Sequence, residues 1–159
     1  MLFRSADVTG FIDTGSYALN ALLSGSIFGG LPNNKISCLA GDPATGKTFY
    51  AIGIAGQFLK DHKDGVVIYF DTEQAVTSDM FTARGVDPER VAVIPVATIE
   101  EFKTQALKIV NDIIEQPEED RKPVFMVLDS LGMLSTEKEM NDSAEGKNVR
   151  DMTKAQQTK

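Results

Sequence analysis

Four short runs along the chain are almost entirely apolar, and two of them reach an aspartate as they end. Continuous apolar runs of this length are typical of strands in a parallel sheet that is covered on both faces. We therefore expect strands at 35–40 (KISCLA), 65–71 (GVVIYFD), 90–96 (RVAVIPV) and 124–130 (VFMVLDS).

Between these runs, apolar residues recur every three or four positions, which is the spacing of one helix face. A helix is expected over 47–59, a shorter one around 78–84, and a third after Thr98, which forms the pattern of a capping box with Glu101. The apolar faces consist of Tyr50, Ala51, Ile54, Ala55 and Phe58 in the first helix, and of Ile99, Phe102, Ala106, Val110 and Ile113 in the third.

Strands that alternate with helices predict an α/β domain, because right-handed crossovers then produce a mostly parallel sheet with helices on both faces. Gly53 and Gly56 are poor helix formers within the first helix, so we expect both to mark close packing.

After Leu134 large apolar side chains become rare. We therefore divide the chain into a core, residues 1–134, and a segment, residues 135–159, that cannot build a core of its own. In this segment we expect a mobile loop to about Gly146, followed by a short helix.

The composition, with 159 residues, 42% hydrophobic and 25% charged, is that of an ordinary soluble domain. No apolar run is long enough to span a membrane, and the N-terminus lacks the apolar core of a secretory signal. Cys38 is expected to be buried in its strand and His62 to lie in a solvated turn, so neither indicates a disulfide or a metal site. These features predict a reducing cytoplasmic setting.

The net charge of −7 disfavours non-specific binding to nucleic acid. The charge is uneven, however, because residues 147–159 carry four basic side chains and one acidic one. A basic end on an acidic body suggests contact with a polyanion, and a solvated helix explains it equally well.

Residues 41–48 spell GDPATGKT, the spacing of a loop that binds nucleotide phosphates, and an apolar run precedes and a helix pattern follows them. Glycines let backbone N–H groups surround the phosphates, the lysine adds a positive charge, and the threonine hydroxyl suits Mg²⁺. The alternative is a glycine-rich turn with an incidental lysine. The predicted nucleotide residues are Gly41, Asp42, Pro43, Ala44, Thr45, Gly46, Lys47 and Thr48.

Acidic residues end two of the predicted strands. Asp129 would face the nucleotide crevice, where its carboxylate is expected to support Mg²⁺ through water. The alternative is that it caps a turn, as a strand-terminal aspartate commonly does. Asp71 ends the 65–71 run and Glu73 lies two residues beyond it, and either one suits activation of the attacking water. The alternative for this pair is capping of the next helix.

Several segments in order resemble the ATPase core of RecA-type recombinases, and among these the bacteriophage strand-exchange recombinases of the UvsX type. They are 12–48, 67–75 (VIYFDTEQA), 84–91 (RGVDPERV) and 124–132 (VFMVLDSLG), and the resemblance covers roughly residues 10–159. It implies a RecA-like, P-loop NTPase fold that is incomplete at its C-terminus.

The resemblance also implies roles for single residues. It selects Glu73 over Asp71 as the residue that orients the hydrolytic water, makes Asp129 the Mg²⁺-associated acid, and places Met80 beside the adenine. Met80 is not aromatic, so only an apolar contact is expected there. We expect Lys147, Arg150 and Lys154 to contact DNA phosphates.

The function implied is an ATP-dependent DNA recombinase that binds single-stranded DNA and catalyses homologous pairing and strand exchange. Its partners would be further copies of itself, in a filament or ring, and single-strand-binding and mediator proteins. One alternative is a helicase or clock-type ATPase of the same fold. A second is a small-molecule phosphotransferase, although the sequence shows no arginine-rich lid segment of the kind that such an enzyme needs. The third is a non-catalytic nucleotide-binding or interaction module.

The resemblance finally implies that a further strand belongs between the phosphate-loop strand and the strand that ends at Asp129. Without it, both strands would lack a ladder partner and expose apolar edges. We therefore expect pairing with another chain or a rearranged sheet of marginal stability.

Overall fold

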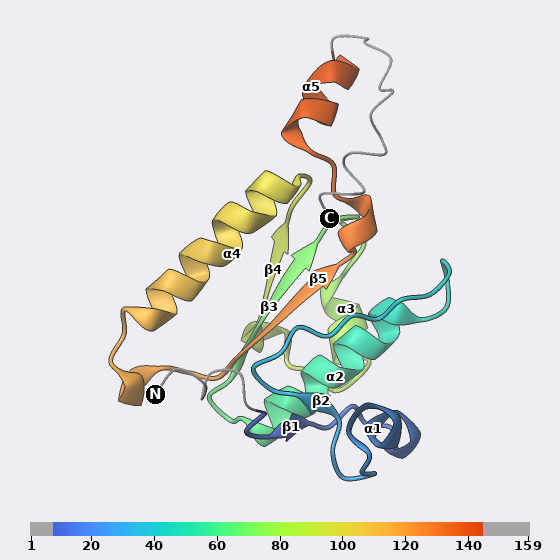
Figure 1. The fold of residues 1–159 in the computed structure, drawn as a ribbon, viewed down its shortest axis with the longest axis vertical. Helices are drawn as coiled ribbons and strands as arrows, with labels where there is room; N and C mark the ends of the chain where they lie inside the picture. The colour runs from blue at the N-terminus through green and yellow to red at the C-terminus, as the bar shows by residue number, and fades with distance from the viewer. Residues whose placement is uncertain (1–7, 145–159) are drawn as a thin grey trace.

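The centre of the fold is a parallel three-stranded sheet with the order β4-β3-β5 (Figure 1). A computed structural model describes residues 8–144. The strands are β3 (Val66–Asp71), β4 (Val91–Pro95) and β5 (Val124–Asp129). In the register of the sheet Asp71 lies opposite both Pro95 and Asp129, so the two aspartates end neighbouring strands at the same edge.

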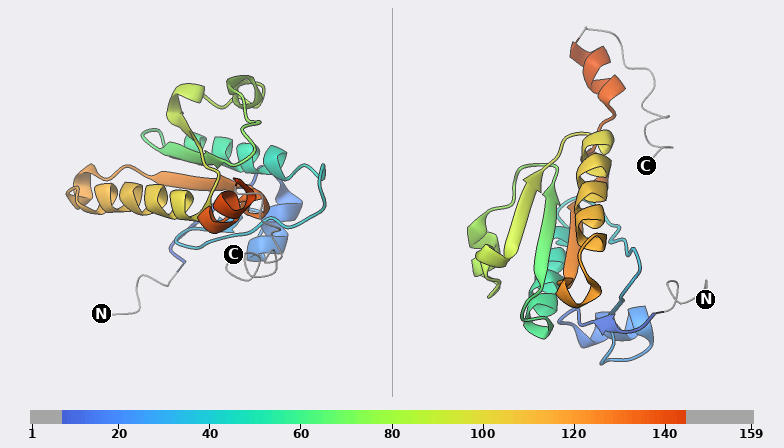
Figure 2. Two further views of the ribbon diagram at one scale, coloured as in Figure 1. Left: turned by 90° about the horizontal axis from the view of Figure 1, so that it is seen from above. Right: turned by 90° about the vertical axis from the view of Figure 1, so that its left-hand side faces the viewer.

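Helices cover both faces of this sheet, as Figure 2 shows from above. Helices α2 (Lys47–Asp61) and α3 (Ser78–Thr82) lie on one face, and α4 (Ile99–Ile114) lies on the other. Short 3-10 turns at Pro88–Arg90, Glu118–Asp120 and Leu131–Met133 connect these elements. The predicted α/β class with helices on both faces is therefore confirmed.

The side chains of β3 alternate between two apolar clusters, because successive residues of a strand point to opposite faces. Val67 and Tyr69 pack toward α2, whereas Ile68 and Phe70 pack toward α4. The larger cluster is formed by Ile52, Ala55, Phe58, Leu59, Val67, Tyr69, Phe81 and Val86, and the smaller by Phe70, Val96 and Leu134.

A small N-terminal unit lies beside α2 (Figure 1). It contains β1 (Phe11–Ile12) paired antiparallel with β2 (Leu31–Pro32), and α1 (Tyr17–Ser24) between them. The buried side chain of Asn20 organises the unit: its amide group donates to Asp13 and to the carbonyl of Ile27, and its oxygen accepts from Thr14. The bond from Asn20, together with one from the Gly15 backbone N–H, lowers the pKa of Asp13, since both stabilise its charged form.

The prediction of a strand at 35–40 is wrong. This segment is irregular and exposed, and Cys38, expected to be buried, is exposed with it. A strand is held by hydrogen bonds to a neighbour, and among the described residues no strand pairs with this segment. The apolar composition of the segment gave no information on whether a neighbouring strand exists.

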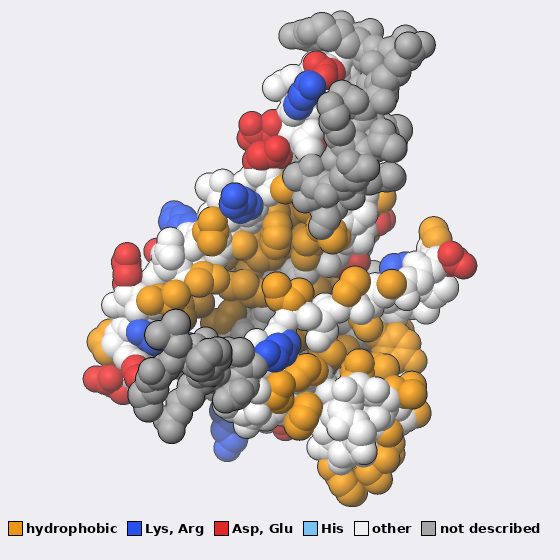
Figure 3. Space-filling model, in the orientation of Figure 1, with side chains coloured by type: hydrophobic (Ala, Val, Ile, Leu, Met, Phe, Trp, Pro, Cys, Tyr) orange, Lys and Arg blue, Asp and Glu red, His pale blue; other side chains and the backbone are white. Residues whose placement is uncertain are grey.

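The second edge of β5 is also open within the described part of the chain, since β5 pairs only with β3. All six of its residues are half-buried. Hydrophobic side chains gather on the face between α4 and the extended 33–45 segment (Figure 3). Among residues 8–144, therefore, the 35–40 segment has no ladder partner and β5 has one on a single side, while pairing with another chain stays a prediction.

The expected loop after Leu134 is wrong over part of its length, because residues Glu137–Ala144 form helix α5. Its first turn is closed by a capping box: the backbone N–H of Glu139 donates to the Thr136 hydroxyl at 3.2 Å, and the Glu139 carboxylate accepts from the Thr136 N–H at 2.8 Å. That pattern was visible in the sequence. Among residues 8–144, no helix combines the length and apolarity needed to cross a membrane.

The two glycines of α2 behave differently. A Cβ atom added to Gly56 would lie 2.9 Å from Cγ2 of Val86, which confirms close packing there. At Gly53 a Cβ would meet no atom within 4 Å, so the expectation of close packing at Gly53 is wrong. In α4, Ile109 rather than the predicted Val110 packs against the smaller cluster.

Candidate nucleotide site

The phosphate loop leads directly into α2, which begins at Lys47. Gly46 precedes the helix with a left-handed backbone (φ 88°), a conformation that glycine adopts without steric cost. No side chain caps the helix start. The backbone N–H groups of the first turn are therefore not covered by a cap, as a site for nucleotide phosphates requires.

The loop is held closed by its own polar groups. The ammonium group of Lys47 donates to the carbonyls of Gly41 at 2.9 Å and Asp42 at 2.8 Å. The Thr45 hydroxyl also donates to the Asp42 carbonyl, at 2.8 Å. A cavity of about 490 Å³ adjoins the loop and is lined by Gly41, Thr45, Lys47, Tyr50 and residues 38–40.

Thr48 and Asp129 meet although they are 81 residues apart in the sequence. The Thr48 hydroxyl, in the first turn of α2, donates to Oδ2 of Asp129 at 2.6 Å. A hydroxyl and a carboxylate are hard oxygen donors of the kind that Mg²⁺ prefers. This pair therefore fits the metal that the sequence predicted.

Tyr69 is a third member of this cluster, and the sequence analysis did not identify it. Its side chain is fully buried, and its hydroxyl donates to the same Oδ2 atom of Asp129 at 2.8 Å. Burial raises the pKa of Tyr69 well above its usual range, and the Asp129 carboxylate adds to the effect. The sequence did contain a sign of this role, because Tyr69 places a phenol within an otherwise apolar run, and a buried tyrosine hydroxyl usually has a hydrogen-bond partner.

The structure distinguishes the two acids at the end of β3, since Asp71 is the last residue of the strand and Glu73 lies in the turn after it. Asp71 is buried, with 3% of its surface exposed, and accepts from the backbone N–H groups of Glu73 at 3.2 Å and Val76 at 2.9 Å. Its carboxylate thus shapes the turn that follows the strand. Glu73 is exposed at that turn, and Gln74 beside it has a left-handed backbone (φ 53°).

Thr72 fastens this turn to the end of β5. Its backbone N–H donates to the Asp129 carbonyl at 2.9 Å, and its hydroxyl accepts from the Ser130 N–H at 2.8 Å. The Asp129–Ser130 peptide is cis. The position of Glu73 is therefore tied to the strand that carries Asp129, a connection that the sequence analysis missed because it depends on strand pairing.

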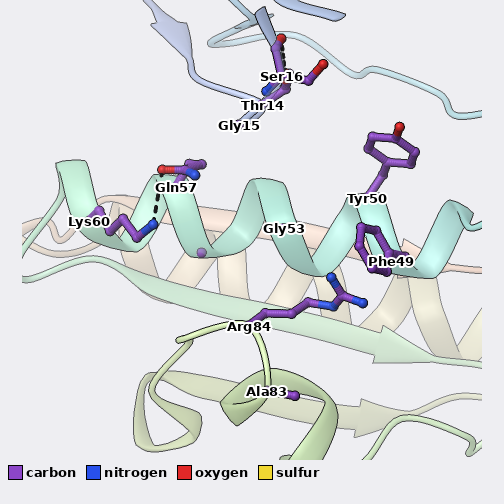
Figure 4. A pocket seen from close by; sticks show the side chains of 11 residues that line it. Thr14, Gly15, Ser16, Phe49, Tyr50, Gly53, Gln57, Lys60, Ala83 and Arg84 are labelled. Carbon is purple, nitrogen blue, oxygen red and sulfur yellow. Dashed lines mark hydrogen bonds between the residues drawn. The ribbon is translucent and has the colours of Figure 1, made fainter.

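A second cavity, of about 300 Å³, lies along α2, between loop 14–16 and the end of α3 (Figure 4). At one end of it the guanidinium of Arg84 stacks over the ring of Phe49, 3.2 Å from the ring centre. Met80, expected beside the base, is exposed in α3 and lines neither this cavity nor the one at the phosphate loop. Lys147, Arg150 and Lys154 lie outside the described residues.

The phosphate loop, the acid at the end of β5 and the alternation of strands with helices are features of P-loop nucleotide-binding domains. The family model of the RecA N-terminal domain matches residues 4–158. This chain belongs to that family.

Individual relatives in the family are similar over most of this chain. The recombination and repair protein of Enterobacteria phage T4 is 34% identical over 143 residues, which are 89% of this chain and 34% of that protein. Protein RecA of Malacoplasma penetrans is 28% identical over 91% of this chain and 44% of its own length. The mitochondrial DNA repair protein recA homolog 3 of Arabidopsis thaliana is 30% identical over 89% of this chain and 31% of its own length. The chain therefore spans between 31% and 44% of the length of these three relatives.

Proposed function

We propose that this chain is the ATP-binding core of a DNA recombinase, in which ATP binding and hydrolysis switch affinity for single-stranded DNA. The observation that carries the proposal is the hydrogen bond between Thr48 and Asp129, which joins the phosphate loop to the neighbouring acidic strand end. The names of the relatives, a recombination and repair protein and RecA proteins, support the biological role.

In this proposal the phosphate loop, Gly41–Thr48, surrounds the phosphates with backbone N–H groups. Lys47 exchanges its two bonds to loop carbonyls for bonds to phosphate oxygens, which is favourable because both partners are then charged. Thr48 and Asp129 are the residues that would hold Mg²⁺, and the ion would supply positive charge against the phosphates.

Glu73 orients the attacking water and accepts its proton. Its exposed carboxylate is available for this role, whereas that of Asp71 is occupied by two backbone N–H groups. We assign no base contact to Met80 beyond the apolar one expected from sequence. Phe49 and Arg84, which stack near the start of α2, offer a planar surface of the kind that a base can contact.

The DNA-binding, strand-exchange and self-association steps belong to the proposal for the whole protein. We place them in the cytoplasm, that of the host if a phage encodes the chain. Lys147, Arg150 and Lys154 remain the candidates for contacts with DNA phosphates, and filament formation and mediator proteins remain expectations.

The test is ATP hydrolysis by this chain, and by a longer chain extended to the full length of the T4 relative, with and without single-stranded DNA. Hydrolysis that DNA stimulates in the longer chain supports the recombinase. Equal turnover in both chains, independent of DNA, would instead indicate another RecA-fold ATPase such as a helicase or clock-type enzyme.

A non-catalytic nucleotide-binding module is the second candidate, and one observation favours it. The segment 35–40, which leads into the phosphate loop, is irregular and exposed rather than part of the sheet. Nucleotide binding without turnover in both the shorter and the longer chain would support that alternative.

A further inference from the structure

We propose that Tyr69 is a positioning residue: its buried hydroxyl holds the carboxylate of Asp129 in the orientation that supports the Mg²⁺–nucleotide complex. The inference rests on the proposed function and adds to it a residue from the core of the domain. Neither the phosphate-loop pattern nor the strand-end acids point to this position.

The sheet brings the two side chains together. Tyr69 lies opposite Val127 in the β3–β5 ladder, and Asp129 is two residues further along β5. Side chains two apart on a strand share a face, and diagonal neighbours across a pair lie within reach of a long aromatic side chain. The phenol of Tyr69 spans that diagonal and donates to Oδ2 of Asp129 at 2.8 Å.

The tyrosine ring itself cannot easily turn away. It has no exposed surface and packs edge-to-face against Phe81, with ring centres 5.6 Å apart and an interplanar angle of 83°. Ile52 and Ala55 of α2 belong to the same buried cluster. The hydroxyl is therefore presented to Asp129 from a rigid, closely packed environment.

Two donors converge on one oxygen atom, because Thr48 also bonds to Oδ2 of Asp129. Together they fix which carboxylate oxygen faces the phosphate loop. Thr48 is the more exposed of the two donors and is the one that would also contact the metal, so Tyr69 supplies the restraint that does not depend on nucleotide. A carboxylate held in advance loses less orientational freedom when the metal binds.

Packing does not require the hydroxyl. The cluster around Tyr69 is apolar, and a phenylalanine would fill the same space. A buried hydroxyl without a partner is costly, so its presence here matters chiefly through the one bond that it makes to Asp129. The effect of removing it should therefore appear at the metal-dependent step and not in nucleotide binding as such.

The experiment compares wild type with Tyr69→Phe, using a fluorescent ATP analogue whose affinity is measured with Mg²⁺ and with EDTA. We expect similar affinities in EDTA, while the gain in affinity on adding Mg²⁺ falls roughly 5-fold in the variant. Tyr17→Phe is the matched control, because it removes a hydroxyl from an exposed position in α1. It should retain the full gain.

A double-mutant cycle with Asp129→Asn tests the route of the effect. Asp129→Asn should abolish most of the Mg²⁺-dependent gain, and adding Tyr69→Phe should then change little further. The proposal is overturned if Tyr69→Phe keeps the full gain, if it weakens binding equally in Mg²⁺ and EDTA, or if its effect persists unchanged in the Asp129→Asn background. If wild type itself shows no gain in affinity with Mg²⁺, the proposed function fails together with this inference. If wild type shows the gain and Tyr69→Phe keeps it, only the inference about Tyr69 fails.

Discussion

The hydroxyl of Thr48 donates a 2.6 Å hydrogen bond to Oδ2 of Asp129, and this bond joins the start of α2 to the end of β5. We predict that Thr48→Ala lowers Mg²⁺-dependent nucleotide affinity by about tenfold or more, because the variant loses both the oxygen that suits the metal and a donor to Asp129. Equilibrium titration with ATP in Mg²⁺ and in EDTA measures the change.

Thr48→Ser is the control for this prediction, since it keeps the hydroxyl and loses only a methyl group. It should retain most of the Mg²⁺-dependent affinity. Equal behaviour of the alanine and serine variants would show that the hydroxyl has no part in metal binding.

Glu73→Gln is expected to reduce ATP hydrolysis by at least about 100-fold, because glutamine keeps the shape of the side chain but cannot accept the proton of water. Nucleotide affinity should stay within about twofold of wild type, since the change concerns a step after binding. Steady-state phosphate release and nucleotide titration measure the two quantities separately.

Asp71→Ala provides the contrast, because it leaves the N–H groups of Glu73 and Val76 without their acceptor. We expect it to lower the free energy of unfolding by about 2 kcal/mol, whereas Glu73→Gln leaves stability unchanged. Turnover that survives Glu73→Gln would contradict the choice of Glu73 as base.

The sequence predicted those parts of the site that depend on local pattern. The GDPATGKT loop, its helix and the acids after two apolar strands were all recognisable, because each is defined within about ten residues. The bond from Tyr69 to Asp129 and the role of Asp71 were not, because the first depends on the register between β3 and β5, and the second on how the chain turns after β3.

The error at 35–40 has the same origin. An apolar run shows that a segment can be buried in a sheet, but whether it forms a strand depends on a partner elsewhere in the chain. Helix α5 was missed for a different reason, since Thr136 and Glu139 display a local capping pattern that low hydrophobicity obscured.

Arg90 anchors the C-terminal end of α2, and we predict that Arg90→Ala destabilises the domain by about 2 kcal/mol. Its guanidinium donates to the carbonyls of Leu59, His62 and Gly65, so three acceptors around the end of α2 lose a charged donor together. Chemical denaturation followed by circular dichroism measures the loss.

Arg121→Ala is the matched control, because Arg121 donates in the same way to the carbonyls of Ile114 and Gln116 around the end of α4 but is exposed. Its loss should cost less than about 1 kcal/mol. A larger effect at Arg121 than at Arg90 would contradict the assignment of Arg90 as the main anchor.

Gly53 and Gly56 offer a comparison within one helix, since both lie inside α2 and differ only in what surrounds them. Gly53→Ala should stabilise the domain by about 0.5–1 kcal/mol, because alanine is the better helix former and its methyl group meets open space. Gly56→Ala gains the same helix propensity, but its methyl group would lie 2.9 Å from Cγ2 of Val86 in the larger apolar cluster. We expect Gly56→Ala to lower the free energy of unfolding by about 1 kcal/mol or more, as is usual when a methyl group is forced into a packed core. Thermal melting of both variants provides the test: opposite signs support the packing described here, whereas stabilisation by both would show that α2 and Val86 can separate freely.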